Sequence, residues 1–188
     1  MWAIVESGSI TKMYTRPQAF KIGDNQYPAN TMALWSESEL QSIGVYPVTI
    51  DGTNLKDEAY YNNTGITYAV DGLAVGGTYG AATAKAIADT LFTAQDETDG
   101  LGTEGEVKSQ GLKSFHKEKV NGMAATLLIP TDWYSLRAAD GGTAVPSNIA
   151  TYRAAIRTKA NTHATAIDGA ADVDALAALV YDWPILGS

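Results

Sequence analysis

The chain contains no cysteine among its 188 residues. This absence excludes disulfide bonds, a thiolate metal site and a cysteine nucleophile, so the fold has to be stabilised by packing. Long apolar runs are missing too: none approaches the roughly 20 residues of a membrane-spanning helix, and we expect no membrane partner. The N-terminal sequence MWAIVESGSI lacks the basic start and apolar core of a secretory signal peptide, which favours a soluble chain made in a cytoplasm.

Basic residues are few as well. There are 13 lysines and arginines against 21 aspartates and glutamates, which gives a net charge of −8 and a pI near 4.6. A nucleic-acid partner requires a basic face that neutralises phosphates, and the basic residues here are scattered along the chain. We therefore expect no nucleic-acid partner.

Histidine occurs only twice, at His116 and His163. The sequence has no HExxH motif and no GxSxG motif, so nothing indicates a zinc protease or an exposed serine nucleophile. His116 lies among Lys113, Lys117 and Lys119, which predicts a solvated helix face, whereas His163 falls on an apolar stripe and is expected to be packed. We therefore predict that the protein is not an enzyme and has no catalytic residue.

Residues 95–105, QDETDGLGTEG, contain two partial ligand motifs. GxGxxG at 100–105 lacks the preceding strand of a dinucleotide site, and the acidic residues around it would repel phosphates. Gln95 to Glu106 fits an EF-hand loop only in part, because Gln95 replaces the usual aspartate. We predict an acidic, Gly-rich linker at residues 95–105 and neither a cofactor nor a metal.

The first part of the sequence predicts a β-rich module over residues 1–94. Trp2–Glu6 and Ile10–Tyr14 are expected to form a hairpin, as are Ala19–Ile22 and Gln26–Tyr27. Ser36 and Glu39 form a capping-box pattern that starts a short helix, which Gly44 ends. Further strands are expected at Val45–Ile50, over Tyr60–Val70 with a break at residues 62–65, and from Thr78. Pro47 predicts that its strand lies at a sheet edge.

Residues 106–188 predict a helical module, so the expected fold class is α+β. A first helix with Val107, Leu112, Phe115, Val120, Met123 and Leu127 on its apolar face is expected to end at Pro130. Thr131 or Asp132 would then cap a short helix that Asp140-Gly141-Gly142 terminates. A long helix from Ser147 carries an apolar stripe of Ile149, Tyr152, Ile156, Ala160, His163 and Ile167, and Val173–Val180 is the last helix.

The aromatic residues are the main indication of function. Four Trp and ten Tyr against three Phe is a composition typical of interfaces. The candidates for an interface are Trp2, Tyr14, Tyr27, Trp35, Tyr46, Tyr60 and Tyr61. Asp132, Trp133, Tyr152 and Trp183 are instead expected to hold the helices together. Asp132 beside Trp133 would also suit a sugar-cleaving site, but a helix cap explains it with fewer assumptions.

The sequence TDWYSLRAADGGTAVP at 131–146, with Tyr152-Arg153-Ala154-Ala155 beyond it, resembles a family of small tailed-phage proteins. The resemblance covers 107–184, includes the terminal Tyr181 to Pro184, and is to tail fibre assembly proteins and to virion structural proteins of marine phages. It implies a non-enzymatic structural or adaptor protein of the virion, made in the host cytoplasm. Its partners would be other phage tail or fibre subunits, with oligomerisation in the assembly.

Two alternatives remain open at this point. The chain could be a tail fibre assembly chaperone, which binds a nascent fibre. It could also belong to another class, a carbohydrate-binding or carbohydrate-active protein that recognises a host surface glycan. Clustered, exposed Trp and Tyr beside carboxylates would favour this last class.

Overall fold

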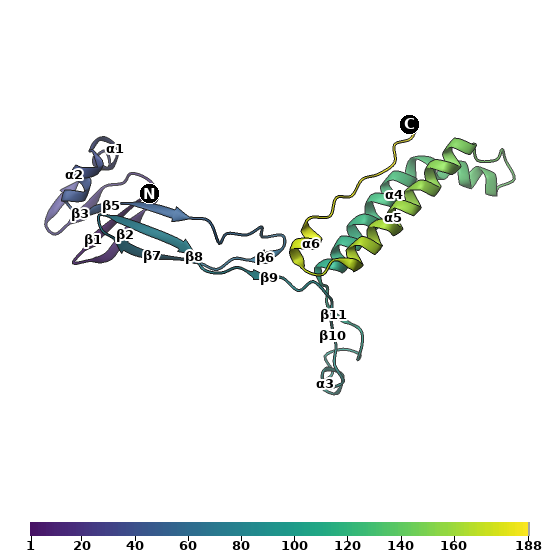
Figure 1. Ribbon diagram of the computed structural model, residues 1–188, viewed down its shortest axis with the longest axis horizontal. Helices are drawn as coiled ribbons and strands as arrows, with labels where there is room; N and C mark the ends of the chain where they lie inside the picture. The colour runs from purple at the N-terminus through teal and green to yellow at the C-terminus, as the bar shows by residue number, and fades with distance from the viewer. Residues whose placement is uncertain (188) are drawn as a thin grey trace. The chain divides into compact units, whose positions relative to one another are not determined.

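The computed structural model describes residues 1–187 and confirms an α+β fold (Figure 1). The chain divides into two compact units, Met1–Thr83 and Ala84–Ser188. From the sequence we expected the boundary between the two modules at residues 95–105, which lie inside the second unit. Strands dominate the first unit and long helices the second.

A curled five-stranded sheet forms the body of the first unit. Its order is β2-β1-β5-β8-β7, and all pairings are antiparallel except β5 with β8. The strands are β1 (Trp2–Glu6), β2 (Ser9–Tyr14), β5 (Val45–Asp51), β7 (Ile66–Asp71) and β8 (Ala74–Tyr79). The predicted first hairpin is confirmed. Ser7 and Gly8 both have positive φ, as in the two-residue turns whose twist matches that of the flanking strands.

Pro47 lies in the middle of this sheet, so the prediction of an edge strand is wrong. The reason is that β5 pairs in two halves. Val45 to Pro47 pairs with β1, and Val48 to Asp51 pairs with β8. Because the pairing with β8 begins only after the proline, the missing N–H of Pro47 costs that ladder no hydrogen bond.

Strand β1 is buried on both faces of the sheet. Ile4 belongs to one cluster with Tyr14, Phe20, Met32, Leu40 and Val45. Ala3 and Val5 belong to a second cluster with Val75, against which Ile10, Met13, Tyr46, Val48, Tyr68 and Val70 pack. The alternation of neighbouring side chains between two apolar clusters explains the uninterrupted apolar run Ala3 to Val5.

Short elements cover the first of these clusters. They are β3 (Phe20–Ile22), β4 (Asn25–Tyr27), α1 (Thr31–Leu34) and α2 (Glu37–Ser42). The predicted capping box is confirmed, with Ser36 accepting from the Glu39 amide and the Glu39 carboxylate accepting from the Ser36 amide. Two further strands, β6 (Tyr61–Asn62) and β9 (Thr83–Ala84), pair with each other.

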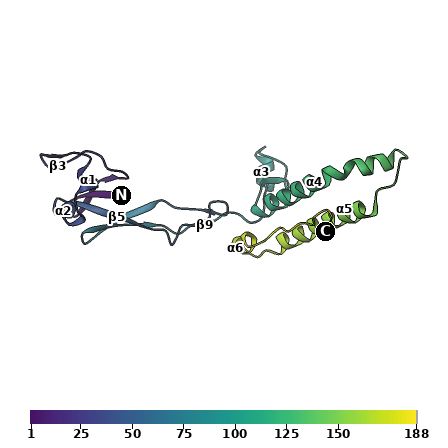
Figure 2. The ribbon, with the colours of Figure 1, turned by 90° about the horizontal axis from the view of Figure 1, so that it is seen from above.

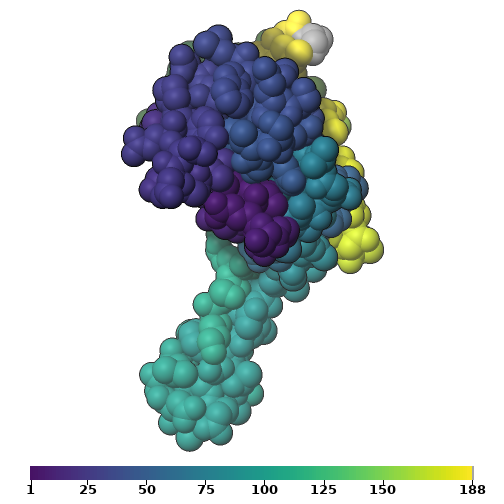
Figure 3. Space-filling view, turned by 90° about the vertical axis from the view of Figure 1, so that its left-hand side faces the viewer, coloured from purple at the N-terminus to yellow at the C-terminus, as the bar shows by residue number. Residues whose placement is uncertain are grey.

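The acidic segment predicted to be a linker is folded within its own unit. It contains α3 (Ala94–Thr98), capped by Thr93, between the paired strands β10 (Thr90–Leu91) and β11 (Val107–Ser109). Figure 1 shows this segment extending away from helices α4 and α5, and the same segment is the blue-green lobe at the bottom of Figure 3. The capping box of Thr93 and Asp96 is a helix-start pattern, and the interpretation from acidic, glycine-rich composition overlooked it.

Helix α4 (Leu112–Ala139) continues through Pro130, so two predictions fail here: the helix does not end at Pro130, and neither Thr131 nor Asp132 is a cap. Proline removes one helix hydrogen bond and strains the preceding turn. The carbonyl that Pro130 leaves without a helix partner is that of Thr126, and donors from the neighbouring helix bond the two carbonyls that follow it. The Tyr152 hydroxyl donates to the Leu127 carbonyl at 3.5 Å, and Arg153 Nη1 donates to the Leu128 carbonyl at 3.0 Å.

The buried face of α4 also differs from the predicted one. His116, Val120, Ala124 and Thr131 are buried, whereas Phe115 and Met123 are exposed. Val107, which was predicted on the same face, lies in β11 and is exposed. His116 is therefore not on a solvated face. Its Nδ1 lies 2.7 Å from the Tyr181 hydroxyl, a partner too distant in sequence to be anticipated.

Helix α5 (Ser147–Gly169) packs beside α4, as Figures 1 and 2 show. Its predicted stripe is confirmed, since Ile149, Ile156, His163 and Ile167 are buried. Gly141, with φ of 79°, ends α4 as predicted. Asp172 caps α6 (Val173–Ala177), and Leu176 joins Val120 and Ile167 in the core. Among residues 1–187, no helix is long and apolar enough to cross a membrane.

Candidate docking surface of the N-terminal unit

The predicted interface aromatics of the first unit do not form one patch. Tyr14 is buried, which removes it from the candidates, and Tyr46 packs against the cluster of Ala3, Val5 and Val75. Tyr60 and Tyr61 are half-buried beside β6, where the Lys56 ammonium lies 6.0 Å from the Tyr61 ring. Only Trp35, with 40% of its surface accessible, is both aromatic and largely exposed in this set.

A row of aromatic rings leads from the core to Trp35. Tyr14 and Phe20 have centroids 6.3 Å apart, and Phe20 stacks on Tyr27 at 4.9 Å. The edge of Tyr27 then meets Trp35 at 5.9 Å with the ring planes 84° apart. These are favourable aromatic geometries, so the exposed indole packs on a row of rings that begins with the buried Tyr14 and Phe20.

Trp35 forms one wall of an apolar hollow of about 210 Å³, which we name the Trp2–Trp35 hollow. Glu37 is its one charged lining residue. The full lining is Trp2, Met32, Trp35, Glu37, Leu40, Val45 and Pro47. Small-molecule sites usually measure roughly 300–1,000 Å³. This hollow is smaller, and it suits one anchoring side chain of a protein partner rather than a whole ligand.

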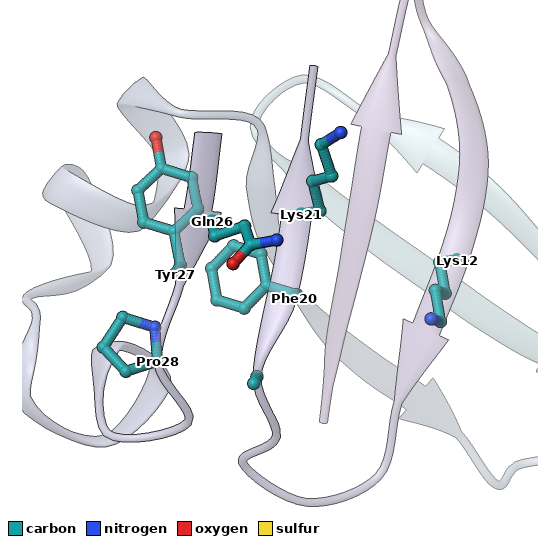
Figure 4. Close-up of a pocket in the computed structure, with 7 residues that line it drawn as sticks. Lys12, Phe20, Lys21, Gln26, Tyr27 and Pro28 are labelled. Atoms are coloured by element: carbon teal, nitrogen blue, oxygen red, sulfur yellow. The ribbon is translucent and has the colours of Figure 1, made fainter. Parts of the chain in front are cut away.

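A wider, open hollow of about 610 Å³ lies between β2 and the β3–β4 hairpin (Figure 4). Figure 4 shows Lys12 on one side and the rings of Phe20 and Tyr27 with the Gln26 amide on the other. Lys21 adds a second cation. The two lysines give this surface positive charge, whereas the one charged residue that lines the Trp2–Trp35 hollow is Glu37.

Of the residues predicted to hold the helices together, three do so. Asp132 Oδ1 of α4 lies 2.8 Å from Arg153 Nη2 of α5. Tyr152 reaches the Leu127 carbonyl, and Trp183 packs with its indole against the His163 ring at 5.2 Å. Trp133 differs from the prediction, because it is half exposed and stacks on Tyr134 and beneath the Arg137 guanidinium.

The two histidines hold the C-terminal segment onto α4 and α5. His116 contacts the Tyr181 hydroxyl, and His163 Nε2 lies 2.9 Å from the Asp182 carbonyl. Burial, with a smaller effect of the Lys119 charge, lowers the pKa of His116. A neutral His116 is therefore part of the packed second unit rather than of an exposed reactive site.

Carboxylates of the second unit act as structural acceptors. Asp89 accepts from the Gly111 amide and the Ser114 hydroxyl at the start of α4, and these bonds lower its pKa. Lys108 and Thr93 hold the pKa of Asp96 at about 2. Within residues 1–187, no group of three or more His, Asp or Glu side chains is placed to hold a metal ion.

Comparisons of this chain with protein-family models, with curated proteins and with solved structures found no match.

Proposed function

We propose that the chain is a structural or adaptor protein of a tailed-phage virion, in the tail or beside a tail fibre, and that it acts through protein–protein contacts. The single observation that carries the docking part of this proposal is the Trp2–Trp35 hollow, an apolar cavity of about 210 Å³ with an exposed tryptophan at its edge. The resemblance of residues 107–184 to virion proteins supports the placement in a phage particle.

Docking at this hollow has a simple physical basis. A partner inserts one apolar side chain against Met32, Leu40 and the Trp35 ring, so that apolar surface of both proteins leaves water. Interface energy concentrates in such central anchors, and Trp is among the residues most enriched there. Exposed Leu34, next to Trp35, extends the apolar contact beyond the hollow.

The test is complementation of a phage that lacks this protein. Trp35→Ala is expected to reduce incorporation of the chain into particles at least tenfold, the effect of about 1.4 kcal/mol of lost contact. Leu73→Ala is the matched control, since Leu73 is an exposed apolar residue of the same unit outside the hollow. Normal incorporation of the Trp35 variant, or equal loss with both variants, contradicts docking at the hollow.

A second function is supported by the wider hollow of Figure 4. The Tyr27 ring, the Gln26 amide and the two lysines are groups that bind acidic sugars of a host surface. This alternative predicts that Lys12→Gln lowers binding to acidic glycans and leaves incorporation into the particle unchanged. Absence of glycan binding by the wild-type chain excludes it.

A further inference from the structure

Helix α4 has a second apolar face, opposite the one that packs on α5. Its members recur with heptad spacing: Phe115, Gly122, Ile129 and Leu136 are seven residues apart, and Lys119, Thr126 and Trp133 each follow one of them by four. All seven residues are exposed. We name this face the α4 seam; it spans three heptads, or about 32 Å of helix.

The large apolar members of the seam are far more exposed than core residues. The accessible fractions are 59% for Phe115, 64% for Ile129, 50% for Trp133 and 66% for Leu136. Helix α5 offers the internal contrast. It has one buried stripe, and its outer face is polar, with Thr151, Thr158, Asn161, Thr162 and Thr165 all exposed. An apolar outer face is therefore a specific property of α4 and not of the helix pair.

Charges on either side of the seam indicate what covers it. Asp132 precedes Trp133 on one flank and Arg137 follows Leu136 on the other, the g and e positions of the heptad. In two parallel helices, a g residue faces the e residue five positions further along the partner, which places Asp132 of one copy beside Arg137 of the other. An antiparallel pair would place like flanks together, carboxylate facing carboxylate.

These residues remain accessible for such a pair. Asp132 contacts Arg153 through one oxygen, and 49% of its side chain is exposed. Arg137 lies over the Trp133 ring at 5.0 Å, so its guanidinium is already held at the edge of the seam. The surface is thus complementary to itself in charge as well as in apolar character.

We propose that copies of this chain associate through the α4 seam, with their α4 helices parallel and in register. Ile129, Trp133 and Leu136 form the apolar contact, Asp132 pairs with Arg137 of the next copy, and Lys119 at a core position fixes the register while weakening the association. The proposal is independent of the phage assignment, because the seam is a property of α4 itself.

The first test is light scattering of the full-length chain over concentrations up to about 0.1 mM, where a micromolar Kd populates the oligomer. Trp133→Gln is expected to weaken self-association at least about 30-fold, as loss of a central anchor does. Val180→Gln, which alters an exposed apolar residue of the same unit off the seam, leaves it unchanged. A monomeric wild-type chain, or an oligomer that persists in the Trp133 variant, overturns the proposal. Circular dichroism verifies that both variants are folded.

The second test determines the relative orientation of the two α4 helices. Because the sequence has no cysteine, an introduced cysteine can form a disulfide only with the same position of another copy. Leu136→Cys at a seam position is expected to form a disulfide with its own copy under mild oxidation, because parallel in-register helices bring equal positions within bonding distance. Asn121→Cys, exposed on another side of α4, is the control and stays monomeric under denaturing electrophoresis. Equal cross-linking at both positions, or none at Leu136→Cys, overturns the parallel arrangement.

Discussion

Removing the Arg153 guanidinium is expected to destabilise the second unit strongly. Arg153 is buried, and it donates from Nη1 to the buried Thr131 hydroxyl at 2.7 Å and to the Leu128 carbonyl. Its Nη2 pairs with the half-exposed Asp132 carboxylate. In Arg153→Met the aliphatic packing is largely kept, while the Thr131 hydroxyl and the carbonyl next to the Pro130 turn lose their charged donor.

The expected loss follows from these contacts. A hydrogen bond from a charged donor contributes roughly 1.5–3 kcal/mol when buried, and the exposed half of the ion pair adds less than about 1 kcal/mol. Arg153→Met should therefore lower the free energy of unfolding by about 3 kcal/mol and the Tm of this unit by about 10–15 °C. Calorimetry of the full-length chain measures both quantities.

Two variants separate the buried bonds from the exposed pair. Asp132→Asn keeps an acceptor for Arg153 and should cost less than about 1 kcal/mol. Arg157→Met, one turn further along α5 and exposed, should change stability by no more than about 0.5 kcal/mol. Equal losses for Arg153→Met and Asp132→Asn would refute the reasoning, because the exposed ion pair would then dominate.

Three further results are expected. Folding lowers the pKa of His116, so this histidine binds a proton more readily in the unfolded chain. The second unit should therefore lose stability as the pH falls below about 6.5. Thermal unfolding measured between pH 7.5 and 5 should show this fall in Tm, and the fall should be smaller in His116→Gln. Gly122→Ala, where a new Cβ has no neighbour within 4 Å, should stabilise α4 by about 0.5–1 kcal/mol. Gly111→Ala should destabilise it, because its Cβ would lie 2.3 Å from the Ala88 backbone. Chemical denaturation should therefore give changes of opposite sign in the free energy of unfolding for the two variants. With a pKa of about 2, Asp96 should remain ionised and hold Lys108 down to pH 3, and an NMR titration midpoint near 4 would contradict this ion pair.

Features set by local backbone chemistry were predictable from the sequence. The Ser36–Glu39 capping box, the Gly141 terminus of α4 and the alternating turn and strand residues of the first hairpin each depend on neighbouring residues, and each is confirmed. The two prolines were misread because their cost depends on distant partners. Pro47 is accommodated by the split pairing of β5, whereas Pro130 lies inside a long helix that is packed along α5.

The candidate docking surface was predictable in part. Trp2 and Trp35 were identified as interface aromatics from composition, yet only folding brings them together with Met32 and Leu40 around one hollow. Tyr14 was misassigned because its alternation in a strand fits a buried and an exposed face equally well. His116 was misassigned because its partner, Tyr181, lies 65 residues away in the sequence.

The central proposal is that this chain is a structural subunit of a phage particle, and the most direct test is quantitative mass spectrometry of purified virions. We expect a fixed copy number of the chain per particle, in agreement with the stoichiometry of the oligomer formed through the α4 seam. Presence in infected-cell lysate together with absence from mature particles would contradict it, and would favour the assembly chaperone instead.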